Sequence, residues 1–294
     1  MRAIPTAAAA GGAPRTTRLP RKSYREVIIG GLKTACVSRD ELTALMIDDC
    51  TAARADSRRL PKLVFASNGH VVSLAGRDAA FRRLHDFADI IHADGQPVVF
   101  ASKLTSAPIP ERSATTDFIH DAAIAARKHG LTFYLLGATE EVNRRCAERM
   151  LELYPGLTIV GRRHGYFSRD EETAICEEIN AAKADIVWVG LGVPLEHDFC
   201  VRNKHRLKAG WVVTAGGCFN FVTGRYARAP QWMRRAGLEW LHRVWREPRR
   251  LFWRYAVTNP HALYLLSTRS FALKTGPIVA DPGSQGSLLQ PKAG

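Results

Sequence analysis

Residues 132–153 read TFYLLGATEEVNRRCAERMLEL, and this stretch decides the fold class. The run TFYLL is typical of a buried strand, and it ends at Gly137. Thr139 then precedes a segment in which apolar residues recur every three or four positions, which predicts a capped amphipathic helix over 140–153. A buried strand followed by such a helix is the unit of a parallel sheet with helices on its faces.

The same alternation continues on both sides of this unit. A Ser168–Glu171 capping box predicts a helix that ends near Lys183, and Pro248 is expected to divide a later helical run in two. Ser67–Gly69 is expected to form a turn. The other predicted strands are 63–66, 90–91, 157–160, 185–189 and 211–214, and the other predicted helices are 39–54 and one that runs through Asn203. The sequence therefore predicts an α/β fold, a Rossmann-like parallel sheet flanked by helices.

Three of the predicted strands run directly into glycines. In parallel sheets, ligands bind beyond the carboxyl ends of the strands, where exposed backbone N–H groups suit a diphosphate. A single glycine after a strand is more often an ordinary tight turn, whereas three such strand ends at one edge favour a binding cleft. The glycines are Gly137, Gly190, Gly192, Gly216 and Gly217.

Two polar residues follow neighbouring apolar segments and are candidates for chemistry. Asp94 comes directly after a predicted strand, and partial burial is expected to raise the pKa of its carboxyl group toward the working range of a general base. Asn68 ends the preceding strand and is expected to face the same cleft. Arg112 follows the Pro108–Pro110 loop and is a candidate phosphate ligand. The alternatives are an ordinary turn aspartate and a lone surface arginine.

Composition and missing motifs exclude several function classes. The 294 residues form one large domain or two, with 46% hydrophobic residues, which excludes disorder as the main state. No apolar run is long enough to predict a membrane-spanning helix, and a signal peptide is not expected. Six scattered cysteines without a C-x-x-C pair predict mostly buried, reduced thiols of a cytoplasmic protein. Because D-x-D is absent, the sequence gives no indication of a bound metal. The absence of G-x-G-x-x-G and P-loop motifs weighs against dinucleotide oxidoreductases and NTPases.

Positive charge is concentrated toward the C-terminus. Residues 201–254 hold 13 Lys/Arg and two acids, so they contribute 13 − 2 = +11 of the net +14. Within residues 231–255, Trp, Leu and other apolar residues recur at helical spacing, with arginines between them. This composition is typical of a helix in a membrane interface. A core-packed helix with a solvated basic face and a nucleic-acid-binding helix are the alternatives.

At this point a family resemblance becomes specific, and it covers residues 64–266, about two thirds of the chain. The matching motifs are HADGQPVVFASKL, ERSATTDFIHDAA, FYLLGATEEV, YPGLTIVGRRHGYF, ADIVWVGLGVPLE, TAGGCFNFVTGRYARAPQWMRRAGLEWLHRVWREPRRLFWRY and TNPHAL. Together they resemble the WecG/TagA/CpsF glycosyltransferases (glycosyltransferase family 26). Within that family the sequence resembles the GumM-like branch, which includes the xanthan cellobiosyl-lipid enzyme, more than the teichoic-acid branch.

The resemblance implies an inverting, metal-independent glycosyltransferase without a cofactor. It implies transfer of a hexose-type sugar from a UDP-sugar to an undecaprenyl-pyrophosphate-linked sugar at the cytoplasmic membrane face, in exopolysaccharide or cell-surface polymer synthesis. The family's base falls on Asp94 and its asparagine on Asn68. Donor contacts are expected at the five glycines and at Pro194 and Glu196. The family's basic appendage, which docks on the membrane and completes the site, falls on Arg228–Arg254; acceptor or phosphate contacts are expected at Arg112, Arg228, Arg243, Arg246 and Arg250.

Two departures from the family pattern bear on specificity. Many members carry threonine where this chain has Ala66, next to Ser67, and a Gln-Glu pair where it has Glu196-His197.

The expected domain organisation is a disordered arm (1–22), an α/β core (23–224), a basic membrane-docking appendage (225–274) and a disordered tail (275–294). The expected partners are the UDP-sugar, the polyprenyl-linked acceptor and an anionic membrane surface, without nucleic acid, and a homo-oligomer is compatible with the sequence. The rival classes are a non-enzymatic nucleic-acid-binding protein that uses the basic segment and a membrane-associated scaffold without turnover.

Overall fold

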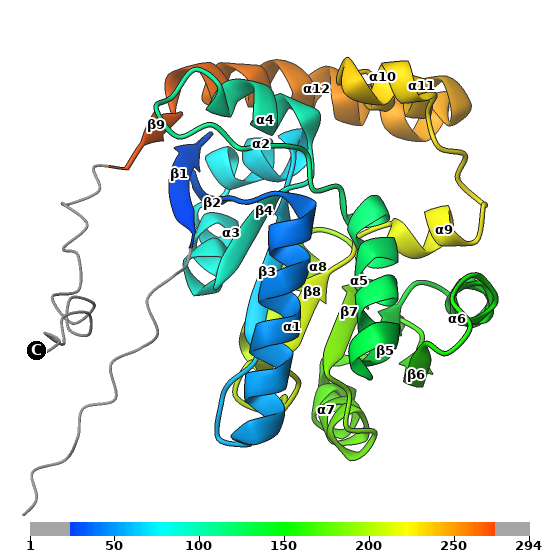
Figure 1. Cartoon of the computed structure of the whole chain (residues 1–294). Helices are drawn as coiled ribbons and strands as arrows, with labels where there is room; N and C mark the ends of the chain where they lie inside the picture. Colours follow the sequence, from blue (N-terminus) through cyan, green and yellow to red (C-terminus); the bar gives the residue numbers. More distant parts are fainter. Residues whose placement is uncertain (1–23, 274–294) are drawn as a thin grey trace, which may run out of the picture.

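The computed structural model describes residues 24–273, so the expected arm and tail lie outside the described residues. Its centre is a six-stranded sheet with the order β4-β3-β8-β7-β5-β6, in which all neighbouring strands are parallel (Figure 1). The strands are β3 (Lys62–Ser67), β4 (Ile90–Ala93), β5 (Thr132–Gly137), β6 (Thr158–Arg163), β7 (Ile186–Gly190) and β8 (Trp211–Thr214). The predicted Rossmann-like parallel sheet is confirmed.

Helices cover both faces of this sheet, and this explains why its strands read as continuous apolar runs. Phe133 and Leu135 pack in one core cluster with α1 (Arg39–Ala55), α5 (Thr115–His129), α6 (Glu140–Leu153) and α9 (Cys218–Val222). Tyr134 and Leu136 point the other way, into a second cluster with α7 (Glu172–Ala181) and α8 (Leu195–Asn203).

Local sequence signals set the starts of several helices. The hydroxyl of Thr139 accepts a hydrogen bond from the Val142 N–H at the start of α6, and Ser168 with Glu171 forms the predicted capping box. The box precedes a short 3-10 turn, η2 (Arg169–Glu171), and α7 ends at Ala181, slightly before the predicted end. The turn expected at Ser67–Gly69 is instead the start of α2 (Gly69–Arg77), because Asn68 caps that helix.

A second, antiparallel sheet lies beside the main one and was not predicted. Its order is β2-β1-β9, with β1 (Arg25–Ile29), β2 (Leu32–Cys36) and β9 (Phe271–Ala272). Gly30 and Gly31 connect β1 to β2 with φ angles of 59° and 86°, which glycine adopts readily in a tight hairpin. Through β9, the end of the described chain pairs with its beginning.

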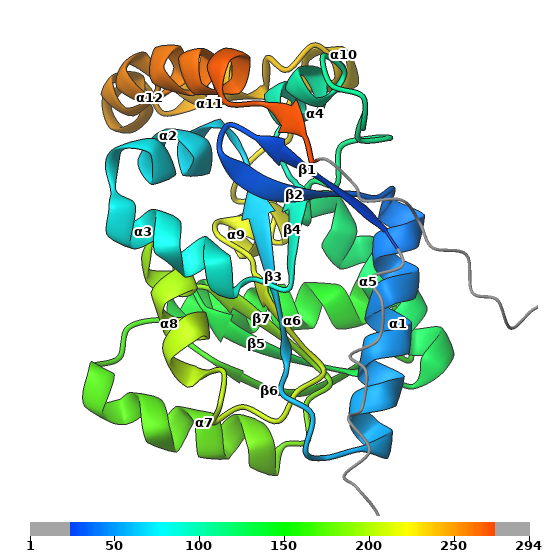
Figure 2. The same cartoon turned by 90° about the vertical axis from the view of Figure 1, so that its left-hand side faces the viewer.

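The C-terminal helices lie together at one end of the molecule, next to α2 and α4 (Gln96–Ser102), as Figures 1 and 2 show. They are α10 (Gln231–Arg235), α11 (Glu239–Arg246) and α12 (Pro248–Thr268). The break predicted at Pro248 is confirmed, since α11 ends before this proline and α12 begins with it. Leu251, Ala262, Leu265 and Leu266 are the buried apolar residues of α12. The remaining short elements are α3 (Ala79–Leu84) and η1 (His85–Phe87).

Candidate functional site

The glycine-rich strand ends meet at one edge of the sheet, as predicted, and close packing explains the glycine at position 137. Gly137 pairs with Gly190 across β5 and β7. A Cβ atom on Gly137 would lie 2.3 Å from the Gly190 carbonyl oxygen, so no larger residue fits there. The Gly190 carbonyl also accepts the N–H of Ala138 at 3.0 Å. Backbone packing thus requires glycine at this point, whatever ligand the edge binds.

Glu196 occupies the space between the next two glycine loops. One carboxylate oxygen, Oε2, accepts the N–H of Gly192 at 3.0 Å and the N–H of Gly216 at 2.9 Å. The expectation that these two N–H groups are free for a diphosphate is therefore wrong. Pro194 and Gly217 lie nearby in the same loops and are exposed.

Burial gives Glu196 an unusual charge state. Its side chain lies in the protein interior, and this burial raises its pKa to about 8. The two glycine N–H groups pull the pKa in the opposite direction, and the negative charge of Asp94 adds to the rise. At neutral pH the Glu196 carboxyl group is therefore largely protonated.

This charge state predicts a specific pH effect on stability. Because the pKa of Glu196 is higher in the folded chain than in the unfolded one, its contribution is fully present below the unfolded pKa of about 4.3 and is lost as pH rises through about 8. Glu196→Gln keeps a neutral acceptor for both N–H groups. Between pH 6 and pH 8 the folded chain holds one proton more than the unfolded chain, which corresponds to about 3 kcal/mol of stability lost by pH 9. Over this range the Tm of the wild type should fall by roughly 5–10 °C more than the Tm of this variant, measured by differential scanning fluorimetry. Parallel Tm curves would show that Glu196 does not titrate in this range.

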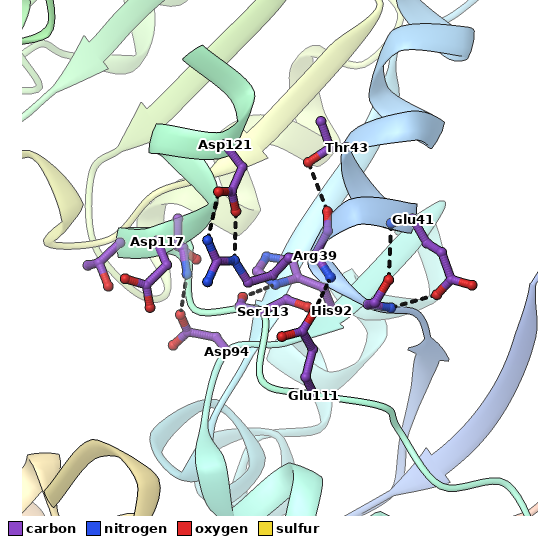
Figure 3. Close-up of polar contacts among 12 residues, drawn as sticks. Arg39, Glu41, Thr43, His92, Asp94, Glu111, Ser113, Asp117 and Asp121 are labelled. Atoms are coloured by element: carbon purple, nitrogen blue, oxygen red, sulfur yellow. Dashed lines mark hydrogen bonds and ion pairs between the residues drawn. The ribbon is translucent and has the colours of Figure 1, made fainter. Parts of the chain in front are cut away.

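Asp94 lies directly after β4 and close to the start of α5 (Figure 3). Three groups fix its position. Its Oδ1 accepts the N–H of Thr115 at 2.8 Å, and its Oδ2 accepts an N–H from the Asn68 side chain at 3.0 Å. The Nε of Arg112 donates to the Asp94 backbone carbonyl at 2.6 Å. The structure brings Asn68 and Asp94 together, as predicted, and adds Arg112 to them.

The expected direction of the Asp94 pKa shift is wrong. Burial does raise the pKa of Asp94, but the Arg112 guanidinium and the N–H groups from Thr115 and Asn68 outweigh burial. The net result is a pKa below the ordinary value of an aspartate. Asp94 is therefore an ionised carboxylate at neutral pH and needs no deprotonation before it accepts a proton.

Asn68 uses both ends of its side-chain amide. The Oδ1 accepts the N–H groups of His70 and Val71 at 3.1 and 3.2 Å, which caps α2, while the Nδ2 donates to Asp94. The residue therefore links the start of α2 to the carboxylate and sets the direction of one Asp94 oxygen.

Arg112 is not a lone surface arginine, because it contacts the C-terminal helices. Its Nη1 forms an ion pair of 2.8 Å with Oε2 of Glu239, at the start of α11. Arg228 approaches the other carboxylate oxygen of Glu239, with its Nε 3.9 Å from Oε1. The Nη2 of Arg228 also donates to both carboxylate oxygens of Asp117, at 2.9 and 3.1 Å. Two arginines from distant parts of the sequence thus converge on Glu239.

Of the other predicted phosphate ligands, Arg243 lies beside Arg228, since both guanidiniums approach the ring of Phe221. The Arg243 guanidinium lies over the rings of Phe221 and Tyr226, at 5.5 and 6.0 Å from their centroids. Arg246 is exposed on α11. Arg250 belongs to α12, and its side chain lies outside what the structure describes.

The loop before α5 is fixed on both sides of Arg112 (Figure 3). The Arg39 backbone N–H donates to Glu111 at 2.9 Å, and the Ser113 carbonyl lies 2.8 Å from Nδ1 of His92. The backbone that carries Arg112 is therefore held in place.

Sequence reasoning missed the roles of Thr115 and Glu239. Thr115 binds Asp94 through its backbone N–H, and because every residue except proline has this group, the residue type does not reveal the contact. Glu239 offered a signal, since it is one of two acids in the basic segment.

Two further observations concern ions and membranes. Within residues 24–273, no three His, Cys, Asp or Glu side chains gather where they could hold a metal ion. In the same part of the chain, every helix is too short or too polar to span a membrane.

The six cysteines are free thiols, and five are buried.

Comparisons with known proteins all match this chain to glycosyltransferases. A family model described as "Glycosyl transferase WecG/TagA/CpsF family" matches residues 27–275. The chain is 30% identical over 207 residues (67% of this chain, 79% of the relative) to the N-acetylglucosaminyldiphosphoundecaprenol N-acetyl-beta-D-mannosaminyltransferase of Bacillus subtilis (strain 168). A protein of the same name from Bacillus spizizenii is 29% identical over 197 residues (67% of this chain, 75% of the relative). Another from Staphylococcus aureus (strain MRSA252) is 26% identical over 209 residues (71% of this chain, 82% of the relative).

Proposed function

The chain belongs to the WecG/TagA/CpsF glycosyltransferase family, and we propose that it moves a hexose-type sugar from a UDP-sugar to a sugar carried on undecaprenyl diphosphate. The names of the relatives support the acceptor class, because they describe transfer to N-acetylglucosaminyldiphosphoundecaprenol. The names of the relatives describe transfer of N-acetylmannosamine, and a hexose-type donor for this chain is part of the proposal. The product would enter an exopolysaccharide or another cell-surface polymer.

One observation carries this proposal, namely the fixed and ionised carboxylate of Asp94 at the carboxyl edge of the sheet. In the proposed reaction, the acceptor hydroxyl oxygen forms a bond to the anomeric carbon while its proton passes to Asp94. The bond from that carbon to the UDP oxygen breaks, and UDP leaves with the electron pair, which inverts the configuration. Because the pKa of Asp94 is low, proton transfer would occur together with bond formation rather than before it.

The leaving diphosphate develops negative charge that needs stabilisation. Fixed positive groups that face this charge lower the barrier without any rearrangement during the reaction. Arg112 supports this role, because it contacts the Asp94 carbonyl and forms an ion pair with Glu239. Arg228 is held at the first turn of α5, the turn whose Thr115 N–H binds Asp94. The reaction we propose therefore proceeds without a metal ion.

We propose that residues 225–274 form an appendage that docks on the cytoplasmic face of an anionic membrane, which makes the enzyme a peripheral membrane protein. Large apolar side chains on these helices are exposed, and arginines accompany them in the sequence. This combination favours a membrane interface, where apolar side chains enter the acyl boundary and arginines meet the lipid phosphates. The exposed residues include Trp232, Leu241, Trp245, Phe252 and Trp253.

A double substitution tests this membrane contact. Trp245→Glu/Trp253→Glu removes two side chains that are 78% and 74% exposed and adds two negative charges. Affinity for vesicles with 30% anionic lipid should fall by tenfold or more, since about 1.4 kcal/mol already corresponds to tenfold. Co-sedimentation measures the bound fraction. Phe87→Glu, an exposed aromatic residue on η1, is the matched control and should bind as the wild type does. Equal binding by all three proteins would contradict the proposed docking face.

The proposed activity is tested by the mass of the lipid product. The purified chain is incubated with a panel of UDP-sugars and undecaprenyl-diphosphate-N-acetylglucosamine in detergent with EDTA. One donor should increase the mass of the acceptor by one sugar residue. An unchanged acceptor mass with every donor, alongside an active control transferase, would contradict the proposed acceptor.

A further inference from the structure

Glu239 holds a position that the reaction described above does not use. It is the first residue of α11, and its side chain is only 15% exposed although it lies in the most basic part of the chain. Its two carboxylate oxygens face two different arginines, Arg112 at 2.8 Å and Arg228 at 3.9 Å. The carboxylate therefore separates two guanidiniums that would otherwise repel each other.

Each of these arginines leads to a different part of Asp94. On one side, Arg112 donates to the Asp94 backbone carbonyl at 2.6 Å. On the other side, Arg228 bonds to Asp117 and, at 3.2 Å, to the Thr116 carbonyl, both in the first turn of α5. The same turn supplies the Thr115 N–H that holds the Asp94 carboxylate at 2.8 Å. The contacts thus form a closed ring from Glu239 through both arginines to Asp94.

We infer that Glu239 is a positioning residue that couples the seating of α11 to the orientation of the Asp94 carboxylate. This inference rests on the proposed function of Asp94 as the base. Its physical reason is that Arg112 bridges two acceptors with one planar guanidinium, so a change at Glu239 moves the group that holds Asp94. A displacement of about 1 Å at a reacting group lowers a rate by as much as 10²-fold.

The first arm of the test needs no activity. Hydrogen exchange of the Thr115 amide reports its bond to Asp94 directly, because that carboxylate is its acceptor. Glu239→Gln should increase exchange of Thr115 and of residues 231–246 by fivefold or more in the purified full chain. Glu148→Gln removes an exposed partner of Arg144 on α6 and should leave both regions unchanged.

The second arm compares kcat in two backgrounds. Glu239→Gln alone should lower kcat by about 10–100-fold, with the donor KM changed less than threefold. In a chain that already carries Arg112→Lys, which cannot bridge both acceptors, the same change should lower kcat less than threefold. This non-additivity separates coupling through Arg112 from a general loss of helix stability.

Either of two results would overturn the inference: unchanged Thr115 exchange in Glu239→Gln, or the same fold loss of kcat in both backgrounds. A wild-type chain without transferase activity would instead overturn the proposed function, and the exchange measurement would then decide the coupling alone.

Discussion

Asp94→Asn is expected to lower kcat by about 10²–10⁴-fold, the usual effect of removing a general base. The asparagine still fits the site and can accept the Thr115 N–H, but it cannot take a proton from the acceptor hydroxyl. Because kcat is measured with saturating donor and acceptor, the loss reports on chemistry rather than on binding. Equilibrium affinity for UDP should change less than about threefold.

The matched control for Asp94 is Asp78→Asn. Asp78 caps α3, accepting the N–H groups of Ala80 and Phe81, and asparagine caps a helix about as well as aspartate. This variant should keep the wild-type kcat and Tm. If Asp94→Asn kept more than about a tenth of the wild-type kcat, another group would have to be the base.

The pKa of Asp94 also sets the pH at which activity declines. Since this pKa lies below the usual aspartate value, protonation of the base should not limit kcat/KM at any pH above about 5. The acidic limb of the pH–rate profile should therefore lie below pH 5.

Asn68 carries the second large effect, and two substitutions separate its two contacts. Asn68→Ala removes both the helix cap and the donor to Asp94, so it should cost about 1 kcal/mol of stability and lower kcat. Asn68→Asp keeps the cap but places a second carboxylate beside Asp94. The variant loses the Asn68 N–H that orients Asp94, and the two carboxylates repel each other, so the base is displaced and kcat at pH 7 should fall by about 10²-fold. In this variant, two carboxylates in contact also raise the pKa of one of them. Its acidic limb should move upward by at least one pH unit.

Asp78→Ala serves as the control for loss of a helix cap. It removes an N-cap of the same kind on α3 and should lower the free energy of unfolding by a similar amount, with kcat unchanged. Asn68→Asp with the wild-type pH profile would show that Asn68 supports the helix and does not orient the base.

Much of the main fold was predictable because its signals are local. Strands buried on both faces produce runs such as TFYLL, and the caps at Thr139 and Ser168 mark where helices begin. The antiparallel sheet escaped prediction, although the Gly30-Gly31 pair between two strands is a readable hairpin signal. Its third strand has only two residues and pairs with a strand more than 240 residues away, so no local pattern marks it.

The site was predictable in position but not in electrostatics. Asn68 and Asp94 follow neighbouring strands, so their proximity follows from the parallel sheet. The low pKa of Asp94 depends on where Arg112 and the Thr115 N–H lie, and only the tertiary structure sets this. The same holds for Glu196, whose residue type does not show that it occupies two glycine N–H groups.

The most direct test of the proposed reaction is acceptor-dependent UDP release, measured for the wild type and Asp94→Asn side by side. A panel of UDP-sugars is assayed with an undecaprenyl-diphosphate-linked sugar in detergent and EDTA. We expect one donor to release UDP only when the acceptor is present, and Asp94→Asn to be slower by at least 10²-fold. Absence of UDP release with every donor, together with absence of UDP binding at equilibrium, would contradict the proposed reaction.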